Sequence, residues 1–167
     1  MSTPPRTPIG RYHPGAPDRA AEGHDLVPEF ETGRFPAHGH TTMRMQGDIV
    51  FQEHTGPFNA EFFRGLKNYR SNLHSSGTLP DIFGVVVSWR GNLLMTPEAL
   101  EAYRDFIQGV RGKVVAYVVS PDAEAMSVML PVFRSIWSDL PRPVELFSTE
   151  QEAVAWVRAR LDELKSR

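Results

Sequence analysis

The chain has no cysteine, so disulfide bonds, thiolate metal sites and cysteine nucleophiles are excluded. It also has no excess of positive charge, because 18 Lys and Arg stand against 20 Asp and Glu, a formal net charge of −2. Such a chain lacks the broad basic field that holds nucleic acid or an anionic membrane. No run approaches the ~18 consecutive apolar residues of a membrane span, and no apolar signal segment begins the chain. We therefore expect a soluble, cytoplasmic protein with no membrane span and no nucleic-acid partner.

Motifs that mark common enzymes are absent as well. The chain contains no Gly-x-Ser-x-Gly elbow, no Walker phosphate loop, no His-Glu-x-x-His and no dinucleotide glycine pattern. His54, at the end of a predicted strand, is the best general-base candidate, but the adjacent Glu53 should point to the opposite face. For His54, and for His74 in a helix-ending loop, an ordinary surface histidine is favoured. The sequence predicts no enzyme, no cofactor and no metal.

Residues 1–40 differ in composition from the rest of the chain. They hold seven of the 14 prolines and four of the six histidines, with apolar residues at no steady period. Such a segment cannot offset an ordering cost of ~1–2 kcal/mol per residue, so we expect a disordered tail. A solvated leader is favoured over a polyproline ligand at Pro4-Pro5 and Pro8. His38-Gly39-His40 lacks the carboxylates and the rigid element that a metal site needs.

Residues 41–167 carry the periodic patterns of one folded domain. A hairpin is expected within 41–54, because methionines alternate with polar residues before Gly47-Asp48, a pair that suits a type II′ turn. Near-continuous apolar runs are typical of parallel strands that are buried on both faces. They predict further strands at 81–89, 113–119 and 144–147, and helical periodicity predicts helices at about 59–73, 97–110, 121–140 and after 148.

Capping residues indicate where the later helices begin. Thr96 followed by Pro97 is a typical helix start, and Ser120 followed by Pro121 repeats it. The last helix has two possible capping boxes, Ser148 with Gln151 or Thr149 with Glu152. In the third helix, Pro131 predicts a bend or an interruption.

The element order is therefore β-β-α-β-α-β-α-β-α. An opening hairpin followed by repeated strand and helix units predicts an α/β fold, since right-handed crossovers make the later strands parallel. We expect a mixed sheet of about five strands with four helices packed against it.

From about Thr41 to Leu164 the chain resembles a STAS domain, the fold of bacterial anti-sigma-factor antagonists and of sulfate-transporter tails. The resemblance rests on the element order and on three stretches, "MQGDIVFQEHTGPFNAEFFRGL", "FGVVVSWRGNLLMTPEAL" and "VELFSTEQEAVAWV". It is closest to the divergent, STAS-like branch of that family.

Typical STAS regulators carry Asp-Ser-Ser-Gly at the start of the second helix, where a kinase phosphorylates a serine. Here Thr96 occupies the aspartate position, Pro97 and Glu98 the two serine positions, and Ala99 the glycine position. The acceptor serine is missing, and Thr96 could accept phosphate only by giving up its role as cap. The resemblance thus implies a divergent member without the standard phospho-switch.

The loops after the carboxyl ends of parallel strands usually hold the ligands of such sheets. We expect a protein partner to bind the face around the second helix and its preceding loop, through Trp89, Arg90, Asn92, Thr96 and Glu98. Because helix N-termini attract anions, a small ligand is possible at Ser88, Ser120, Asp122 and Ser148, although local capping also explains these serines.

The resemblance and the polar edge together predict a non-catalytic STAS-like domain that acts by protein–protein recognition in bacterial regulation. The alternative is a small-molecule or lipid-binding module of the same fold, with an enclosed apolar pocket beside the third helix. Its aromatic and methionine residues are more simply explained as core; they are Met126, Met129, Phe133 and Trp137. The partner and the oligomeric state are left open by the sequence.

Overall fold

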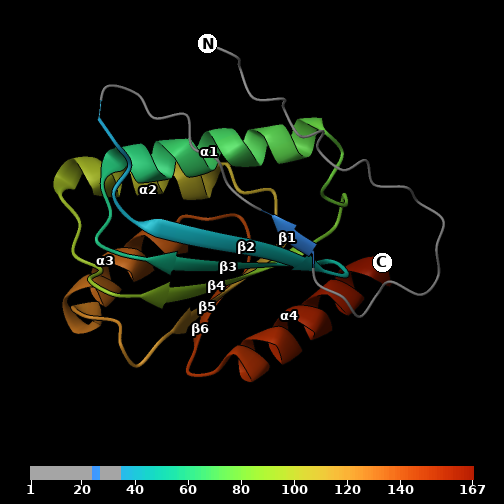
Figure 1. Cartoon of the computed structure of the whole chain (residues 1–167). Coiled ribbons are helices and arrows are strands. Elements are labelled where there is room, and N and C mark those ends of the chain that lie inside the picture. The colour runs from blue at the N-terminus through green and yellow to red at the C-terminus, as the bar shows by residue number, and fades with distance from the viewer. Residues whose placement is uncertain (1–23, 27–34) are drawn as a thin grey trace, which may run out of the picture.

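A computed structural model describes residues 24–26 and 35–167 (Figure 1). The described residues form one sheet with the strand order β1-β2-β3-β4-β5-β6. Strands β1 to β3 pair antiparallel, whereas β3 to β6 pair parallel, so the sheet is mixed as expected. The strands are β1 (His24–Leu26), β2 (His40–Gln46), β3 (Ile49–Thr55), β4 (Gly84–Arg90), β5 (Val114–Val119) and β6 (Val144–Phe147).

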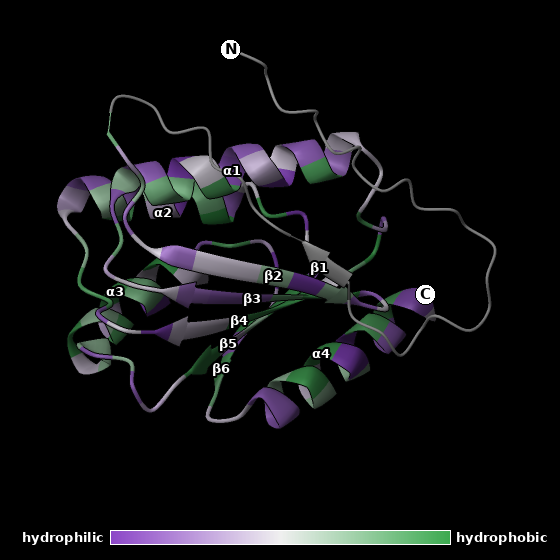
Figure 2. Ribbon diagram, viewed as in Figure 1, coloured by the Kyte–Doolittle hydropathy of each residue, from purple (hydrophilic) through white to green (hydrophobic). Residues whose placement is uncertain are grey.

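Helices cover both faces of the sheet. The helices are α1 (Ala60–Ser75), α2 (Pro97–Gln108), α3 (Met126–Ser138) and α4 (Glu150–Lys165). Helices α1, α2 and α3 pack in one core cluster, and α4 packs in a second cluster on the other face (Figure 1). Figure 2 shows that α1 turns hydrophobic residues toward the sheet and hydrophilic residues outward. This architecture confirms the predicted fold class.

Strand β4 supplies side chains to both cores. Val85 and Val87 belong to the cluster beneath α1, α2 and α3, whereas Val86 packs with Val157 of α4. Successive side chains of a strand alternate between faces, so burial on both sides requires an unbroken apolar run. An added Cβ at Gly84 would overlap the Val157 side chain, so this glycine allows α4 to approach the sheet closely.

The opening hairpin turns at Gly47, which has φ of +60°, as the first turn residue of a type II′ hairpin requires. Strand β1, which no sequence pattern predicted, adds an antiparallel neighbour to β2 through the pairing of Asp25 with Arg44. It lies within the segment 1–40 assigned to a tail. Residues 1–23, which include Pro4, Pro5 and Pro8, and residues 27–34 lie outside the described residues. The division at residue 40 stays a prediction.

Helix α3 begins later than predicted. Ser120 is not its cap, because the helix starts at Met126 after Ala125, which is left-handed with φ of 62° and makes no side-chain cap. The preceding residues pair instead with the loop after β4, where Glu124 N donates to Gly91 O at 2.8 Å. The helix then runs through Pro131 without interruption. Backbone pairing with the loop after β4 thus takes the place of the side-chain cap that the local sequence predicted.

The cap predicted at Thr96 is present, and α1 has a cap that was not predicted. Asn59 accepts from Phe62 N at the start of α1, and Thr96 accepts from Ala99 N at the start of α2. Of the two capping boxes considered for α4, the one with Thr149 forms, since its hydroxyl accepts from Glu152 N.

Candidate functional site

Trp89, near the end of β4, lies inside the protein. Its side chain is 2 % exposed and stands edge-on to the Phe133 ring, with centroids 4.2 Å apart. The expectation that Trp89, Arg90 and Glu98 are exposed together is therefore wrong for Trp89. The alternation of β4 turns this side chain toward the face that α1, α2 and α3 cover, so it cannot reach a partner.

Arg90, the last residue of β4, is half-exposed and joins three segments at the carboxyl edge of the sheet. Its Nε donates to Glu53 of β3 at 2.8 Å, and its Nη1 lies 3.6 Å from the Asp122 carboxylate. The pKa of Asp122 is lowered, mainly by a hydrogen bond from Ser120 and further by the charge of Arg90. The structure thus brings Arg90, Ser120 and Asp122 together. The ion pairs of Arg90 lie at the surface, where such pairs contribute little to stability.

The two remaining ligand candidates are Ser88 and Ser148. Ser88 is half-buried within β4, in register with Glu53 of β3 and Val118 of β5. Ser148 is exposed beside the cap of α4, and its side chain makes no hydrogen bond to residues 24–26 or 35–167. Ser88 is thus a neighbour of the Arg90–Glu53 pair, whereas Ser148 follows β6.

The β4–α2 loop, residues 91–96, has a fixed backbone. Gly91 has φ of +66°, and the Asn92 side chain accepts from Leu94 N at 2.9 Å. Leu93 N donates to Glu124 O at 3.2 Å, and the Leu93 side chain is fully buried. Leu94 points outward and is 50 % exposed. The loop therefore anchors one leucine in the core and presents the next to solvent.

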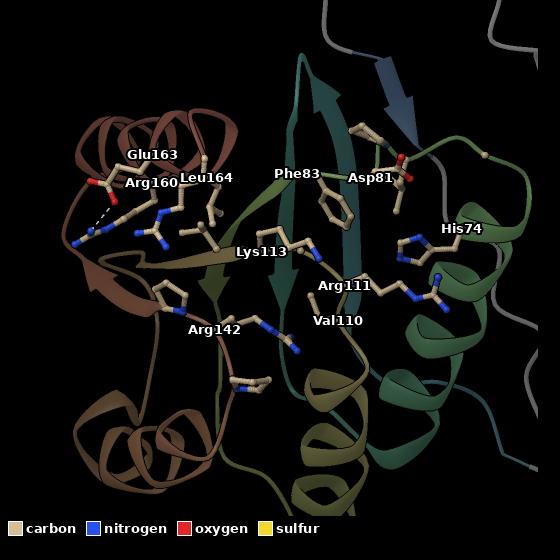
Figure 3. A pocket seen from close by; sticks show the side chains of 18 residues that line it. His74, Asp81, Phe83, Val110, Arg111, Lys113, Arg142, Arg160, Glu163 and Leu164 are labelled. Carbon is tan, nitrogen blue, oxygen red and sulfur yellow. Dashed lines mark hydrogen bonds and ion pairs between the residues drawn. The ribbon is translucent and has the colours of Figure 1, made fainter.

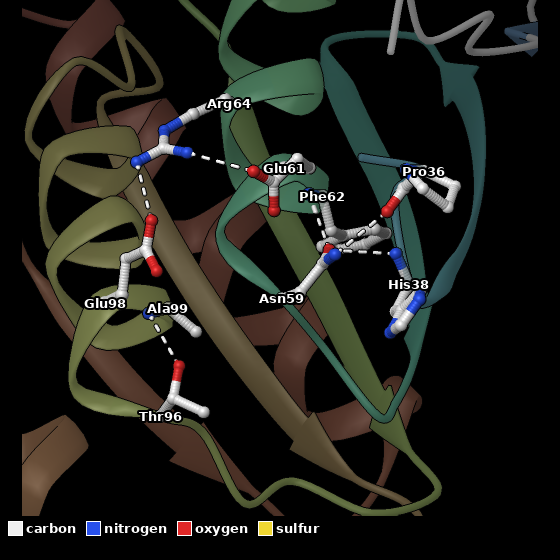
Figure 4. A network of polar contacts seen from close by, with 9 residues as sticks. All are labelled: Pro36, His38, Asn59, Glu61, Phe62, Arg64, Thr96, Glu98 and Ala99. Carbon is white, nitrogen blue, oxygen red and sulfur yellow. Dashed lines mark hydrogen bonds and ion pairs between the residues drawn. The ribbon is translucent and has the colours of Figure 1, made fainter. Parts of the chain in front are cut away.

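The first turn of α2 continues this exposed surface (Figure 4). The Thr96 hydroxyl accepts from Ala99 N at 3.2 Å. The exposed Glu98 carboxylate accepts from Arg64 of α1 at 3.3 Å, and Arg64 also pairs with Glu61 at 3.2 Å. Asn92, Thr96 and Glu98 thus lie on one continuous segment of the chain, as the sequence required.

Exposed apolar residues at this edge were not singled out from the sequence. Leu94 is one of them, and Val128 in the first turn of α3 is 64 % exposed. Val128 follows Glu124, whose backbone pairs with the β4–α2 loop. The signal for Leu94 was the pair Leu93-Leu94 in a loop, where one of two neighbouring apolar side chains commonly faces outward.

His54 is buried, so the expectation of a surface histidine is wrong. It is 4 % exposed, and its ring stands edge-on to Phe62. Its Nδ1 lies 2.8 Å from the Thr41 hydroxyl and its Nε2 lies 3.2 Å from the Gln52 side-chain oxygen. Since that amide oxygen is an acceptor, Nε2 carries the proton and Nδ1 accepts from Thr41. Burial lowers the pKa of His54 to about 3, so the ring is neutral at neutral pH.

His74 lies in the last turn of α1 and is half-buried, rather than in a surface loop. Its ring contacts Phe83, and its Nε2 is buried without a hydrogen-bond partner in the described part of the chain. It lies at the opposite edge of the sheet from Arg90 and the β4–α2 loop, because it precedes the amino end of β4.

The aromatic residues of α3 are core residues, as their spacing predicted. Met129, Phe133 and Trp137 are buried in the cluster that α1 and α2 share. A separate small hollow, lined by His54, Trp89 and residues of α1 and α2 but by no residue of α3, has a volume of ≈ 10 Å³. That volume holds about one water molecule.

Two further absences concern the described residues. No group of three or more His, Asp or Glu side chains within them is placed to hold a metal ion, and this includes His38 and His40. No helix among them has both the length and the apolar character for a membrane crossing.

Comparison with solved structures supports the fold. A scan of known protein families finds no match, and neither does a search of curated proteins. A solved structure that resembles this one is an uncharacterized protein of the DUF3478 family from Shewanella loihica PV-4, described as having a SpoIIAA-like fold. The likeness covers 75 % of this chain and 98 % of that one, with a TM-score of 0.50 at 11 % sequence identity. The fold of this chain is thus SpoIIAA-like, that is, STAS-like.

Proposed function

We propose that this STAS-like domain acts without catalysis, by protein–protein recognition in bacterial regulation, and that its partner binds the β4–α2 loop and the first turn of α2. The observation that carries the proposal is Leu94, a large apolar side chain held half-exposed by a loop whose backbone is fixed on both sides. A residue held in this way can enter a partner's pocket at a low cost in conformational entropy.

The charge next to Leu94 narrows the chemistry of the partner. Glu98 is exposed at the start of α2, where it shares Arg64 with Glu61. A partner that offers an apolar pocket for Leu94 and a basic side chain for Glu98 would match both features. Exposed pairs such as Arg64 with Glu98 stabilise a fold by ~0–1 kcal/mol, so a partner can replace them readily.

Control of the partner by phosphorylation of a serine is not part of this proposal. The two positions that carry serine in typical STAS regulators are Pro97 and Glu98 here. Glu98 places a constant negative charge in the first turn of α2, and Thr96 uses its hydroxyl as the cap. We therefore expect the binding surface to be constitutively available.

The surroundings of His54 support a role without catalysis. Both ring nitrogens are occupied by Thr41 and Gln52, and the adjacent hollow of ≈ 10 Å³ is too small for a substrate. With its pKa lowered to about 3, the ring would not take up a proton at neutral pH as a general base must. The hydrogen bond of His54 to Thr41 instead joins β3 to β2, and its bond to Gln52 lies within β3.

The experiment is affinity purification from the organism that encodes the chain, with Leu94→Asp and Glu98→Lys as test variants. Leu164→Asp is the matched control, since Leu164 is also an exposed leucine, 37 % accessible, at the far end of α4. We expect one partner to be retained by the wild type and by Leu164→Asp but lost from the test variants. The purified partner should then bind the wild type directly, whereas equal binding to Leu94→Asp would refute the proposed face.

A further inference from the structure

The amino-terminal edge of the parallel strands carries a groove with a volume of ≈ 810 Å³ (Figure 3). We call it the amino-edge groove. Phe83, Lys113 and Pro143, which directly precede β4, β5 and β6, form its floor, and side chains of α1 and α4 flank it. The volume falls within the ~300–1,000 Å³ of small-molecule sites. The groove lies at the opposite edge of the sheet from the β4–α2 loop.

The lining of the groove is basic although the whole chain carries a net charge of −2. Five Arg and Lys side chains line it against two acidic ones. The basic residues are Arg111, Lys113, Arg142, Arg160 and Arg167, and the acidic residues are Asp81 and Glu163. A concave surface with one sign of charge concentrates ligands of the opposite sign, so this groove favours an anion.

Two of these cations have local partners that explain them. Arg142 donates to the carbonyl oxygens of Ile107 at 3.1 Å and Gln108 at 3.4 Å, where α2 ends. Cations stabilise helix C-termini, where carbonyls lack partners. Arg160 pairs with Glu163 at 3.0 Å along α4.

Arg111 and Lys113 have no such explanation. Both are exposed, and neither side chain makes an ion pair or hydrogen bond with residues 24–26 or 35–167. They are two residues apart on the short connection between α2 and β5, and Figure 3 shows both side chains in the groove. These two charges are therefore available to a ligand.

His74 gives a second, independent sign of a missing ligand. Its Nε2 is buried without a partner in the described part of the chain, at the α1 side of the same groove. The pKa of His74 is lowered, first by burial and then by the nearby charges of Arg111 and Arg70. An uncompensated positive potential is thus present at the groove, and an anion would relieve it.

The groove also has an apolar part. Leu79, Phe83, Val110 and Leu164 contribute to its lining together with three prolines. Small-molecule sites usually combine apolar walls with a few polar groups that orient the ligand. A bare inorganic ion would leave these walls without a contact.

We infer that the amino-edge groove binds an organic phosphate that carries two or more negative charges and an apolar or aromatic part, with Arg111 and Lys113 as phosphate-binding residues. The inference does not depend on the proposed partner surface, which shares no residue with the groove. The phosphate can belong to a soluble molecule or to a lipid headgroup.

The test uses the full chain and three probes, namely inorganic pyrophosphate, ADP, and vesicles of phosphatidic acid with phosphatidylcholine vesicles as the control. Calorimetry and vesicle co-sedimentation measure binding, and NMR follows the ring protons of His74 and His38. We expect ADP or the phosphatidic acid vesicles to bind and to raise the pKa of His74, because a bound anion favours the charged imidazolium. The ring-proton chemical shifts of His38, which lies outside the groove, serve as the control. Binding of ADP indicates a soluble ligand, and binding of phosphatidic acid vesicles without ADP indicates a headgroup. Binding of pyrophosphate alone would contradict the apolar part of the proposed ligand.

Variants separate a specific site from a general charge effect. Arg111→Gln and Lys113→Gln should each weaken binding about tenfold, the usual effect of losing one charge-assisted hydrogen bond. Arg134→Gln removes the same charge from an exposed position on α3 outside the groove and should change nothing. Failure of all three probes, an unmoved His74, or equal weakening by Arg134→Gln overturns the inference. The His74 titration of the wild type decides the matter even where a variant fails to fold.

Discussion

The backbone of Asn92 lies so close to Gly56 that a Cβ at Gly56 would overlap the Asn92 carbonyl oxygen. Gly56 N also donates to Arg90 O at 3.0 Å. The segment after β3 therefore supports the β4–α2 loop by direct backbone contact, which no larger residue would allow. The position of Leu94 depends on a glycine that lies outside the proposed partner surface.

Gly91 and Gly77 form a matched pair that tests this contact. Both have positive φ, +66° and +70°, but a Cβ at Gly91 would lie 2.9 Å from Gly56 O, whereas a Cβ at Gly77 would meet nothing within 4 Å. Gly77→Ala should cost only the backbone strain of ~1–2 kcal/mol. Gly91→Ala should cost about 1–3 kcal/mol more, from overpacking, and should weaken partner binding. Urea denaturation measures both, and equal losses would mean that the loops do not support each other.

Tyr103 is the centre of a buried hydrogen-bond network between helices and sheet. Its hydroxyl accepts from Trp137 Nε1 at 2.8 Å and bonds the Tyr117 hydroxyl at 2.9 Å. Tyr103→Phe leaves both partners buried without it, which should lower the free energy of unfolding by about 1–3 kcal/mol. Tyr117→Phe keeps the bond to Trp137 and should cost less. Chemical denaturation of the two variants checks the order, and the reverse order would contradict the network.

His54 should make the stability of the protein fall on mild acidification. Its pKa is about 3 when folded and near the ordinary 6.5 when unfolded, so the unfolded chain binds the extra proton between these values. The contribution of the neutral ring is complete above pH 6.5 and is lost as the pH falls toward 3. The slope approaches ~1.4 kcal/mol per pH unit.

Unfolding measured by denaturant from pH 7 to pH 5 checks this dependence above the range where carboxylates titrate. A His54→Gln variant, which cannot take up the proton, should be less stable at pH 7 but show a flatter profile. His74→Gln is the comparison, since the pKa of His74 is also lowered. An unchanged slope in His54→Gln would show that another group takes up the proton.

Thr96 should behave as a cap rather than as a phosphate acceptor. Thr96→Ala removes the bond to Ala99 N and should cost about 1 kcal/mol, whereas Thr96→Asp supplies another good cap and should retain stability. Intact-mass analysis of the protein from its own organism should show no added phosphate. A phosphorylated Thr96, or a Thr96→Ala variant as stable as the wild type, would contradict this role.

Local patterns correctly predicted the element order from β2 onward and the cap at Thr96, and they gave Thr149 as one of two possible caps for α4. A cap joins atoms three residues apart, and a helix or strand is set by the spacing of apolar residues along a few turns. The same reasoning misplaced the start of α3, because the segment before it bonds to the β4–α2 loop instead of capping its own helix. A competing bond to a distant segment leaves no trace in a local pattern.

The sequence by itself determined a mixed, helix-covered sheet, since buried apolar runs alternating with amphipathic helices have few other ways to hide their apolar surface. Only the tertiary structure decided that Trp89 and His54 are enclosed, that Leu94 is presented to solvent, and that Arg111, Lys113 and His74 meet at one groove. The periodicity of a strand tells which side chains share a face, but whether that face is covered at the strand's end depends on helices distant in sequence. Charges spread over several connections likewise become one site only when parallel strands bring their amino ends together.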